Sequence, residues 1–278
     1  MKNNLSGIQS EVNVRLMSWN VHLGVSTTRT PMTANVIASW ILRHGATIVC
    51  LQEVPRKAWA ESVAACLGRH WSVAYLELDA LTKSGNAILT LLNTSNAKVH
   101  KLLFDDDGGM QTCIPWRRRG GVPRRGALML ELADVNLSVV CTHFSADVLM
   151  CGQFRQVKQL HEWITGHAAH FEHEKRLRPP ALSCTIMAGD LNAHSVSPVL
   201  KWLRDRSWVD TWRTTTNRKH GYMAGCTFPS HCPVERIDYI MMYHGGNIMR
   251  APEVRRAWVA QNDRVSDHCG VVVDGVVF

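Results

Sequence analysis

Short apolar segments rich in β-branched residues recur along nearly the whole chain, and longer segments with the spacing of amphipathic helices lie between them. The expected strands are 12–19, 47–51, 71–76, 86–92, 127–132, 137–142, 184–188, 236–242 and 270–273. The expected helices are 33–43, 56–67, 151–170 and 198–206. Because short strands alternate with helices, we expect β-sheets that pack together and are flanked by helices.

The 278-residue chain has 31 Lys and Arg residues against 23 Asp and Glu residues, a formal net charge of +8. A basic balance favours a polyanionic partner such as a nucleic acid or a phosphorylated ligand. No apolar run is long enough to cross a bilayer, and the first ten residues lack the apolar core of a secretory signal. We therefore expect an intracellular protein, cytoplasmic or nuclear, without stable membrane insertion. Its oligomeric state is not predicted.

The chain has no long linker rich in Pro, Ser or Gly. The expected organisation is a flexible N-terminal segment, 1–11, followed by a single domain, 12–278. Two irregular segments interrupt the pattern: 104–126 joins an acidic run to a basic run, and 214–233 is polar. The nine cysteines form no disulfide or zinc framework, so a reducing compartment is favoured.

Polar residues lie at the points where the expected strands begin or end. A single Asn after a strand is usually a turn former, and a single Asp is usually a helix cap. An ordered set of such residues, each at a strand boundary, instead favours chemistry at the edge of the sheets. The set consists of Asn20, Glu53, His143, Asp190, Asn192, Asp238, Asp267 and His268.

Short motifs surround these residues. They are WN at 19–20, LQEV at 51–54, SGNAIL at 84–89, RGAL at 125–128, THF at 142–144, GDLNA at 189–193, TFPS at 227–230, RIDYI at 236–240 and SDHCGV at 266–271. In this order they resemble the endonuclease/exonuclease/phosphatase superfamily, which shares its fold with deoxyribonuclease I. The resemblance implies an α/β (α+β) fold with two packed mixed β-sheets flanked by helices, a four-layer α/β sandwich.

The resemblance also implies a Mg²⁺ site, in which Glu53 is the principal carboxylate and Asn20 and Asp267 lie beside it. Mg²⁺ prefers hard oxygen ligands, and Mn²⁺ is expected to substitute for it. A bound ion of this kind would polarise a phosphoryl oxygen and neutralise developing charge.

Catalytic roles follow from the same resemblance. Asp190 would orient or deprotonate the attacking water, and Asn192 would hold that water or a phosphate oxygen. His268 would stabilise the transition state, with Asp238 orienting its ring. His143 would act from the opposite side of the phosphate, as a hydrogen-bond donor or as an acid.

Substrate contacts are expected from Ser84, Asn86, Arg125 and Phe228, and each has an alternative. Ser84 and Asn86 would lie near the phosphate or form a strand-entry turn. Arg125 belongs to a basic run that either contacts a nucleic-acid backbone or is a solvated loop. Phe228 would line the substrate entrance or pack in the interior.

The function expected from the set is divalent-metal-dependent phosphoester hydrolysis, with a phosphodiester in nucleic acid or a nucleic-acid adduct as the substrate. The THF segment argues against abasic-site endonucleases, which typically have Tyr there. Two alternatives remain open: a phosphoesterase for inositol phosphates or sphingolipid head groups, and a catalytically silent binding protein on the same fold. Gln153 stands where Arg is common in the superfamily, an exchange that the sequence does not explain.

Overall fold

Two six-stranded sheets form the centre of the computed structural model, which describes residues 13–26, 31–80, 83–105, 124–146, 150–174, 184–215, 225–243, 253–261 and 265–277. The first sheet has the order β11 (Arg256–Ala260), β12 (Gly270–Val277), β1 (Asn13–Asn20), β2 (Ile48–Val54), β4 (Gly85–Thr90), β3 (Ser72–Glu77). The second has the order β5 (Lys98–Leu103), β6 (Gly126–Leu132), β7 (Leu137–His143), β8 (Cys184–Asp190), β10 (Asp238–Tyr243), β9 (Trp208–Asp210).

Both sheets are mixed. β1 pairs in parallel with β2, and β7 pairs in parallel with β8, whereas the other pairs are antiparallel. The helices are α1 (Ala34–His44), α2 (Lys57–Leu67), α3 (Cys151–Glu174), α4 (Pro198–Arg204) and α5 (Thr211–Thr214), with short 3₁₀ helices η1 (His22–Gly24) and η4 (Ala133–Val135). The predicted α/β fold of two packed mixed sheets flanked by helices is confirmed.

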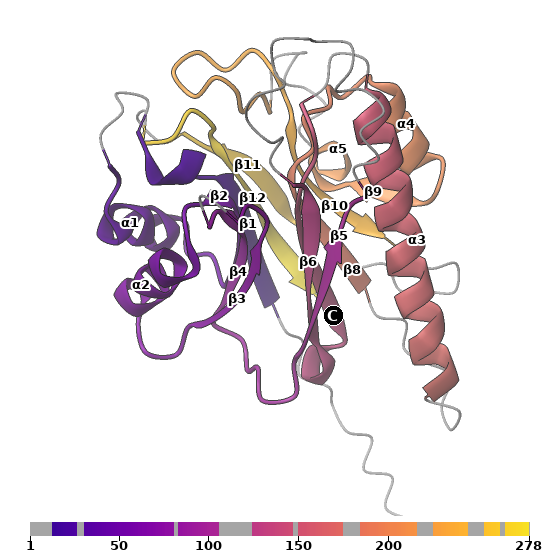
Figure 1. The fold of residues 1–278 in the computed structure, drawn as a ribbon, viewed down its shortest axis with the longest axis horizontal. Helices are drawn as coiled ribbons and strands as arrows, with labels where there is room; N and C mark the ends of the chain where they lie inside the picture. The colour runs from indigo at the N-terminus through magenta and orange to yellow at the C-terminus, as the bar shows by residue number, and fades with distance from the viewer. Residues whose placement is uncertain are drawn as a thin grey trace, which may run out of the picture.

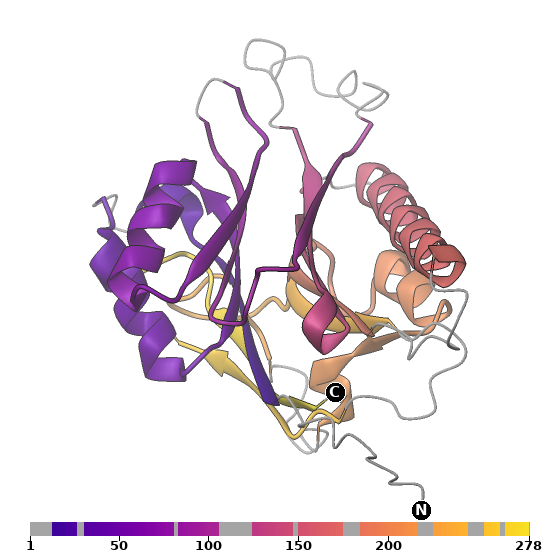
Figure 2. The same cartoon turned by 90° about the horizontal axis from the view of Figure 1, so that it is seen from below.

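The layers follow from strands that are buried on both faces. Figure 2 shows α1 and α2 on one side of the paired sheets and α3 and α4 on the other. Along β1, Leu16 faces the core between the sheets, whereas its neighbour Met17 packs in the core beneath α1 and α2. Along β8, Ile186 faces the core between the sheets and Met187 packs in the core beneath α3 and α4. Burial on both faces explains why the strands appear as continuous apolar runs in the sequence.

Each expected strand and helix has a counterpart, but the sequence prediction omitted three strands and one short helix. β5 alternates exposed and half-buried residues, β9 has three residues, and β11 begins with an exposed arginine. Strands that are short or lie at a sheet edge lack the buried apolar run by which the others were recognised. The missing helix, α5, is one turn long.

Strand direction brings the predicted polar residues to one edge of the sheets. β1 and β2 run in parallel and end near Asn20 and Glu53, and β7 and β8 run in parallel and end at His143 and Asp190. The antiparallel strand β10 begins at Asp238, which pairs with Asp190. Parallel strands present their carboxyl ends at the same edge, where sites commonly form.

Among the helices that the structure describes, none is both long and apolar enough to span a membrane. The predicted N-terminal segment 1–11 lies outside the described residues, and its division from a single domain 12–278 stays a prediction.

Candidate active site

Asn20 links the two sheets at the centre of the site. Its Nδ2 donates to Asp190 Oδ2 over 3.1 Å and to Glu53 Oε1 over 3.4 Å. Asn20 and Asp190 are almost fully buried, whereas the side chain of Glu53 is 28% exposed. Glu53 has a left-handed backbone, with φ of 52°. A non-glycine residue in this region is strained, and such strain concentrates at functional sites.

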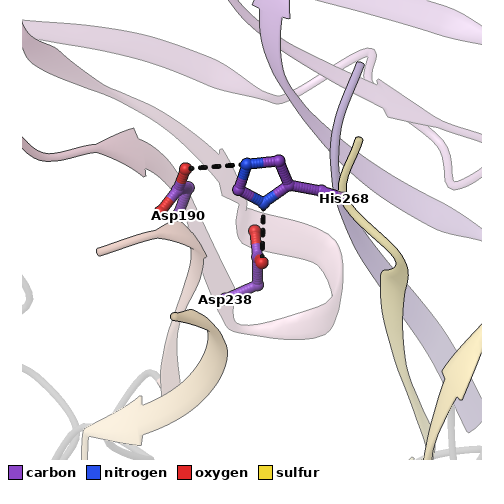
Figure 3. Close-up of side chains that lie close together, drawn as sticks. All are labelled: Asp190, Asp238 and His268. Carbon is purple, nitrogen blue, oxygen red and sulfur yellow. Dashed lines mark hydrogen bonds and ion pairs between the residues drawn. The ribbon is translucent and has the colours of Figure 1, made fainter. Parts of the chain in front are cut away.

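His268 lies between two carboxylates, as Figure 3 shows. Its Nδ1 donates to Asp238 Oδ2 over 2.9 Å, and its Nε2 faces Asp190 Oδ2 at 3.7 Å. Trp19 Nε1 donates to the backbone oxygen of His268, and Ser266 Oγ accepts from its backbone nitrogen. The ring is therefore fixed through its backbone as well as through its side chain.

The carboxylates give His268 a positive charge. Burial alone would lower the pKa of His268, but the charge and hydrogen bond of Asp238, together with the charges of Asp190 and Asp267, raise it to about 10. Burial and then the charge of Asp238 raise the pKa of the Asp190 carboxyl to about 7, although His268 opposes this shift. A pKa near neutrality suits a group that accepts a proton during catalysis.

His143 has the opposite charge state. Its Nδ1 lies 2.8 Å from Arg125 Nη1, and because a guanidinium only donates, this nitrogen must be the acceptor. Burial, then the positive charges of Arg125 and His268, hold the pKa of His143 well below its usual range. The neutral ring therefore carries its proton on Nε2, which lies 3.4 Å from Asp190 Oδ2.

Asn192 joins the ends of β7 and β8. Its Nδ2 donates to Phe144 O over 2.9 Å; it also lies 3.1 Å from His143 Nε2, but both of these nitrogens are donors, so the bond to Phe144 O is the one that holds the side chain. Its backbone nitrogen donates to Asp190 Oδ1 over 2.9 Å. The backbone of Asn192 is left-handed, with φ of 47°, and these contacts hold it there.

Asp267 reaches the same cluster through its neighbours. Ser266 Oγ donates to Asn20 O over 2.7 Å, and Asp267 Oδ2 lies 2.8 Å from His22 Nδ1. The backbone nitrogen of His22 in turn donates to Asn20 Oδ1. The structure thus connects all eight of the residues predicted as metal ligands or catalytic groups.

One group in this cluster has ligand atoms close enough together for a divalent cation, and the predicted ligands form a second group with suitable chemistry. Asp190, Asp238 and His268 have ligand atoms within 4.8 Å of one another. However, an imidazole that is protonated on both nitrogens has no lone pair for a metal. The carboxylates of Glu53 and Asp267 are 28% and 27% exposed, and with Asn20 they offer the hard oxygen atoms that Mg²⁺ prefers. The residues predicted as ligands therefore fit the ion better.

Of the four predicted substrate contacts, two touch the histidines that the sequence predicts as catalytic. Arg125 contacts His143, and the Phe228 ring lies 4.9 Å from the His268 ring. Asn86 instead donates from Nδ2 to Gly126 O between the sheets. Ser84 lies in the turn before β4, where its backbone oxygen accepts from the backbone nitrogens of Leu78 and Asp79.

Sequence reasoning missed three supporting residues. His22 follows the predicted WN motif but contacts Asp267, which is distant in sequence. Gln153, whose exchange was unexplained, donates from Nε2 to Ser145 O and Asn192 O, so it ties together the segments that follow β7 and β8. Thr227, expected only as part of the TFPS motif, donates its hydroxyl to Asp238 Oδ2. Thr227 lies within a motif and His22 lies shortly after one, which could have identified them, but the sequence does not indicate which residues the three contact.

The profile of the Endonuclease/Exonuclease/phosphatase family matches residues 17–268. Among curated proteins, no sequence matches.

Several solved structures share the fold. An endonuclease/exonuclease/phosphatase from Beutenbergia cavernae is 22% identical, with a TM-score of 0.66 over 94% of this chain and 71% of its own. A mannosyl-6-phosphatase from Bacteroides thetaiotaomicron is 15% identical, with a TM-score of 0.68 over 95% and 99%. The human Nocturnin catalytic domain with bound sulfate is 17% identical, with a TM-score of 0.64 over 94% and 92%. At these identities the likeness concerns the fold.

Proposed function

Because the chain belongs to the endonuclease/exonuclease/phosphatase family, we propose that it is a divalent-metal-dependent phosphodiesterase that hydrolyses a phosphodiester in nucleic acid or in a nucleic-acid adduct. The observation that carries the proposal is the chain of contacts in which Asp190 lies between neutral His143 and cationic His268. A carboxylate with one neutral and one charged donor beside it is suited to activate water next to a phosphate.

Glu53, Asn20 and Asp267 would hold the ion, Mg²⁺ or Mn²⁺. When bound, it would supply charge neutralisation at the phosphoryl oxygens. Glu53 and Asp267 are the partly exposed carboxylates of the site, and Asn20 is in hydrogen-bond contact with Glu53. An ion that binds there would lie beside Asp190, which Asn20 also contacts.

The protein's own groups would activate the water. The Asp190 carboxylate takes a proton from water as the water oxygen bonds to phosphorus, the ester P–O bond breaks on the opposite side, and the leaving oxygen takes a proton from solvent. His268, charged because Asp238 faces its Nδ1, stabilises the negative charge that develops on the phosphoryl oxygens. Asn192 and His143 position the phosphate from the other side. A nucleic-acid substrate is supported by the net charge of +8 and by the guanidinium of Arg125 at the site.

The proposal is tested by measuring turnover of DNA, RNA, 5′-tyrosyl DNA, inositol phosphates, sphingomyelin, a sugar 6-phosphate and bis-p-nitrophenyl phosphate, with Mg²⁺, Mn²⁺ or EDTA. We expect nucleic-acid or adduct turnover that requires the metal and falls by at least about 10³-fold in Asp190→Asn, because the water loses its proton acceptor. Asp205→Asn changes an exposed aspartate at the C-terminal cap of α4 and is the matched control.

Equal turnover in the wild type and Asp190→Asn would overturn the proposal. Turnover confined to inositol phosphates, sphingomyelin or the sugar phosphate would keep the reaction and overturn the substrate class. Calorimetry separates a silent binding protein from an enzyme that lacks its substrate: we expect Mg²⁺ binding that is lost in Glu53→Ala.

A further inference from the structure

Thr227 contacts the same oxygen that orients His268. The Thr227 side chain is fully buried, and its hydroxyl donates to Asp238 Oδ2. Asp238 Oδ2 also accepts from His268 Nδ1 over 2.9 Å. Two donors therefore converge on one carboxylate oxygen, and only one of them belongs to the predicted catalytic set.

The second oxygen of the Asp238 carboxylate shows why the hydrogen bond from Thr227 affects the orientation of the carboxylate. Asp238 Oδ1 is buried and has no hydrogen-bond partner among the residues that the structure describes. The terminal torsion of an aspartate has a broad energy profile, so a carboxylate held by one donor turns easily. With the Thr227 hydroxyl in place, Oδ2 has two fixed donors, and the oxygen that faces His268 is defined.

The backbone of Thr227 is tied to the segment that carries His268. Cys269, the next residue after His268, donates its backbone nitrogen to Thr227 O over 2.8 Å. Thr227 N donates to Glu235 O over 2.7 Å, on the segment that leads to Asp238. One residue thus contacts both members of the pair: Asp238 through its side chain, and the His268 segment through its backbone.

The residues that follow Thr227 strengthen the same attachment. The Phe228 ring lies 4.9 Å from the His268 ring. Ser230 N donates to Asp267 O over 2.7 Å, and the Ser230 hydroxyl donates to Ser266 O. Segment 227–230 therefore holds segment 266–269 by backbone and side-chain contacts, and within it Thr227 is the residue that reaches a catalytic carboxylate.

We propose that Thr227 is a positioning residue that sets the orientation of Asp238 and thereby the alignment of His268 with the phosphate. This inference rests on the proposed function of the site. Because Thr227 acts through Asp238 and not on the substrate, its removal lowers the rate of the chemical step and leaves substrate binding in place.

The experiment compares Thr227→Val, which replaces the hydroxyl by a methyl group of similar shape, with Thr227→Ser, which keeps the hydroxyl. We expect kcat to fall about 10- to 100-fold in Thr227→Val, the range usual for partners that orient site ligands. KM should stay within about twofold, and Thr227→Ser should recover most of kcat. Thr211→Val is the matched control, because it removes another buried threonine hydroxyl that donates to β10, at Ile240 O, away from the carboxylate.

A second measurement needs no turnover. The His268 Nδ1–H proton, donated to Asp238, should give a far-downfield proton NMR signal in the metal-free protein. We expect that signal to shift or broaden in Thr227→Val and to keep its position in Thr227→Ser and Thr211→Val.

The outcomes separate this inference from the proposed function. If Asp190→Asn is inactive while Thr227→Val keeps wild-type kcat and an unchanged NMR signal, the positioning role is wrong and the function stands. If the wild type hydrolyses no phosphoester, the proposed function fails, and the NMR signal alone decides whether Thr227 orients Asp238. An equal loss of kcat in Thr211→Val would attribute the effect to stability and overturn the role.

Discussion

His143 and His268 come from different parts of the fold, lie in one site and are both buried, yet they differ in charge. His268 donates from Nδ1 to the Asp238 carboxylate, whereas His143 accepts at Nδ1 from the Arg125 guanidinium. The pKa of His268 is raised to about 10, and that of His143 is held well below its usual range. Burial lowers both values, so the neighbour at Nδ1 makes the difference.

The comparison explains how one carboxylate serves two histidines. The Nε2 atoms of His143 and His268 lie 3.4 Å and 3.7 Å from the same atom, Asp190 Oδ2. Two cationic rings at these distances would repel each other, and two neutral rings would leave Asp238 and Asp190 without a compensating charge. One neutral and one charged histidine satisfy both requirements: burial, reinforced by Arg125, keeps His143 neutral, and Asp238 charges His268.

The largest effect is expected from removing the partner that charges His268. Asp238→Asn keeps the shape of the side chain but removes its charge, so His268 loses its main source of positive charge and its defined orientation. We expect kcat to fall by about 10³- to 10⁴-fold, as for other buried aspartates that orient a catalytic histidine. Steady-state kinetics on the best substrate of the panel measures the loss.

Asp274→Asn is the control. Asp274 lies on β12, is partly exposed and forms an ion pair with Arg15 of β1. A loss of less than tenfold in Asp238→Asn would contradict the view that the carboxylate at Nδ1 sets the role of His268.

A smaller effect is expected at the other histidine. Arg125→Gln removes the guanidinium beside His143 but leaves the ring buried. The pKa of His143 should rise and stay below its usual value, because burial is the larger cause of the shift. We expect kcat to fall about tenfold, since an orienting partner is lost but the ring keeps its neutral form.

Nitrogen chemical shifts of the imidazole, recorded against pH in metal-free protein, measure the pKa of His143. Arg124→Gln is the matched control, because Arg124 is the exposed neighbour of Arg125. An unchanged His143 titration in Arg125→Gln would show that the guanidinium does not determine its charge.

The sequence predicted that polar residues at strand ends gather at one edge of the sheets. The end of an expected strand can be located in the sequence. Parallel strands such as β7 and β8 then place their last residues, His143 and Asp190, side by side. The buried strands were predictable for a similar reason, because burial on both faces leaves a continuous apolar run. Edge strands such as β5, with exposed residues, carry no such pattern.

The charge of each group was not predictable, because it depends on contacts between residues distant in sequence. Arg125 stands in a basic run, and nothing in that run distinguishes an arginine that contacts His143 from a solvated one. Thr227 likewise stands in the TFPS motif, and nothing in that motif indicates that its hydroxyl donates to Asp238. Nothing in the sequence distinguishes His22. In the structure its own backbone is left-handed, with φ of 46°, and its ring contacts Asp267.

Within any one pH unit the effect on stability is small, and the two histidines should act with opposite sign. His143 has a lowered pKa in the folded state, so below about pH 6.5 the unfolded chain takes up a proton that the folded protein does not, and stability falls with falling pH. His268 has a raised pKa, so its contribution is fully present below about pH 6.5 and is lost as the pH rises towards 10. Each histidine contributes at most about 1.4 kcal/mol per pH unit.

Urea unfolding of metal-free wild type, His143→Gln and His268→Gln between about pH 5 and pH 10 measures both contributions. The stability difference between wild type and His143→Gln should decrease as the pH falls below about 6.5, because only the wild type carries the histidine that resists protonation. The difference between wild type and His268→Gln should decrease on the alkaline side, as the imidazolium loses its proton and its attraction to Asp238. His70→Gln, which changes an exposed histidine, controls for general effects of the exchange. The contrary outcome is that both stability differences change in the same direction with pH. The two histidines would then share one charge state, and the contacts with Arg125 and Asp238 would not explain a difference in charge between them.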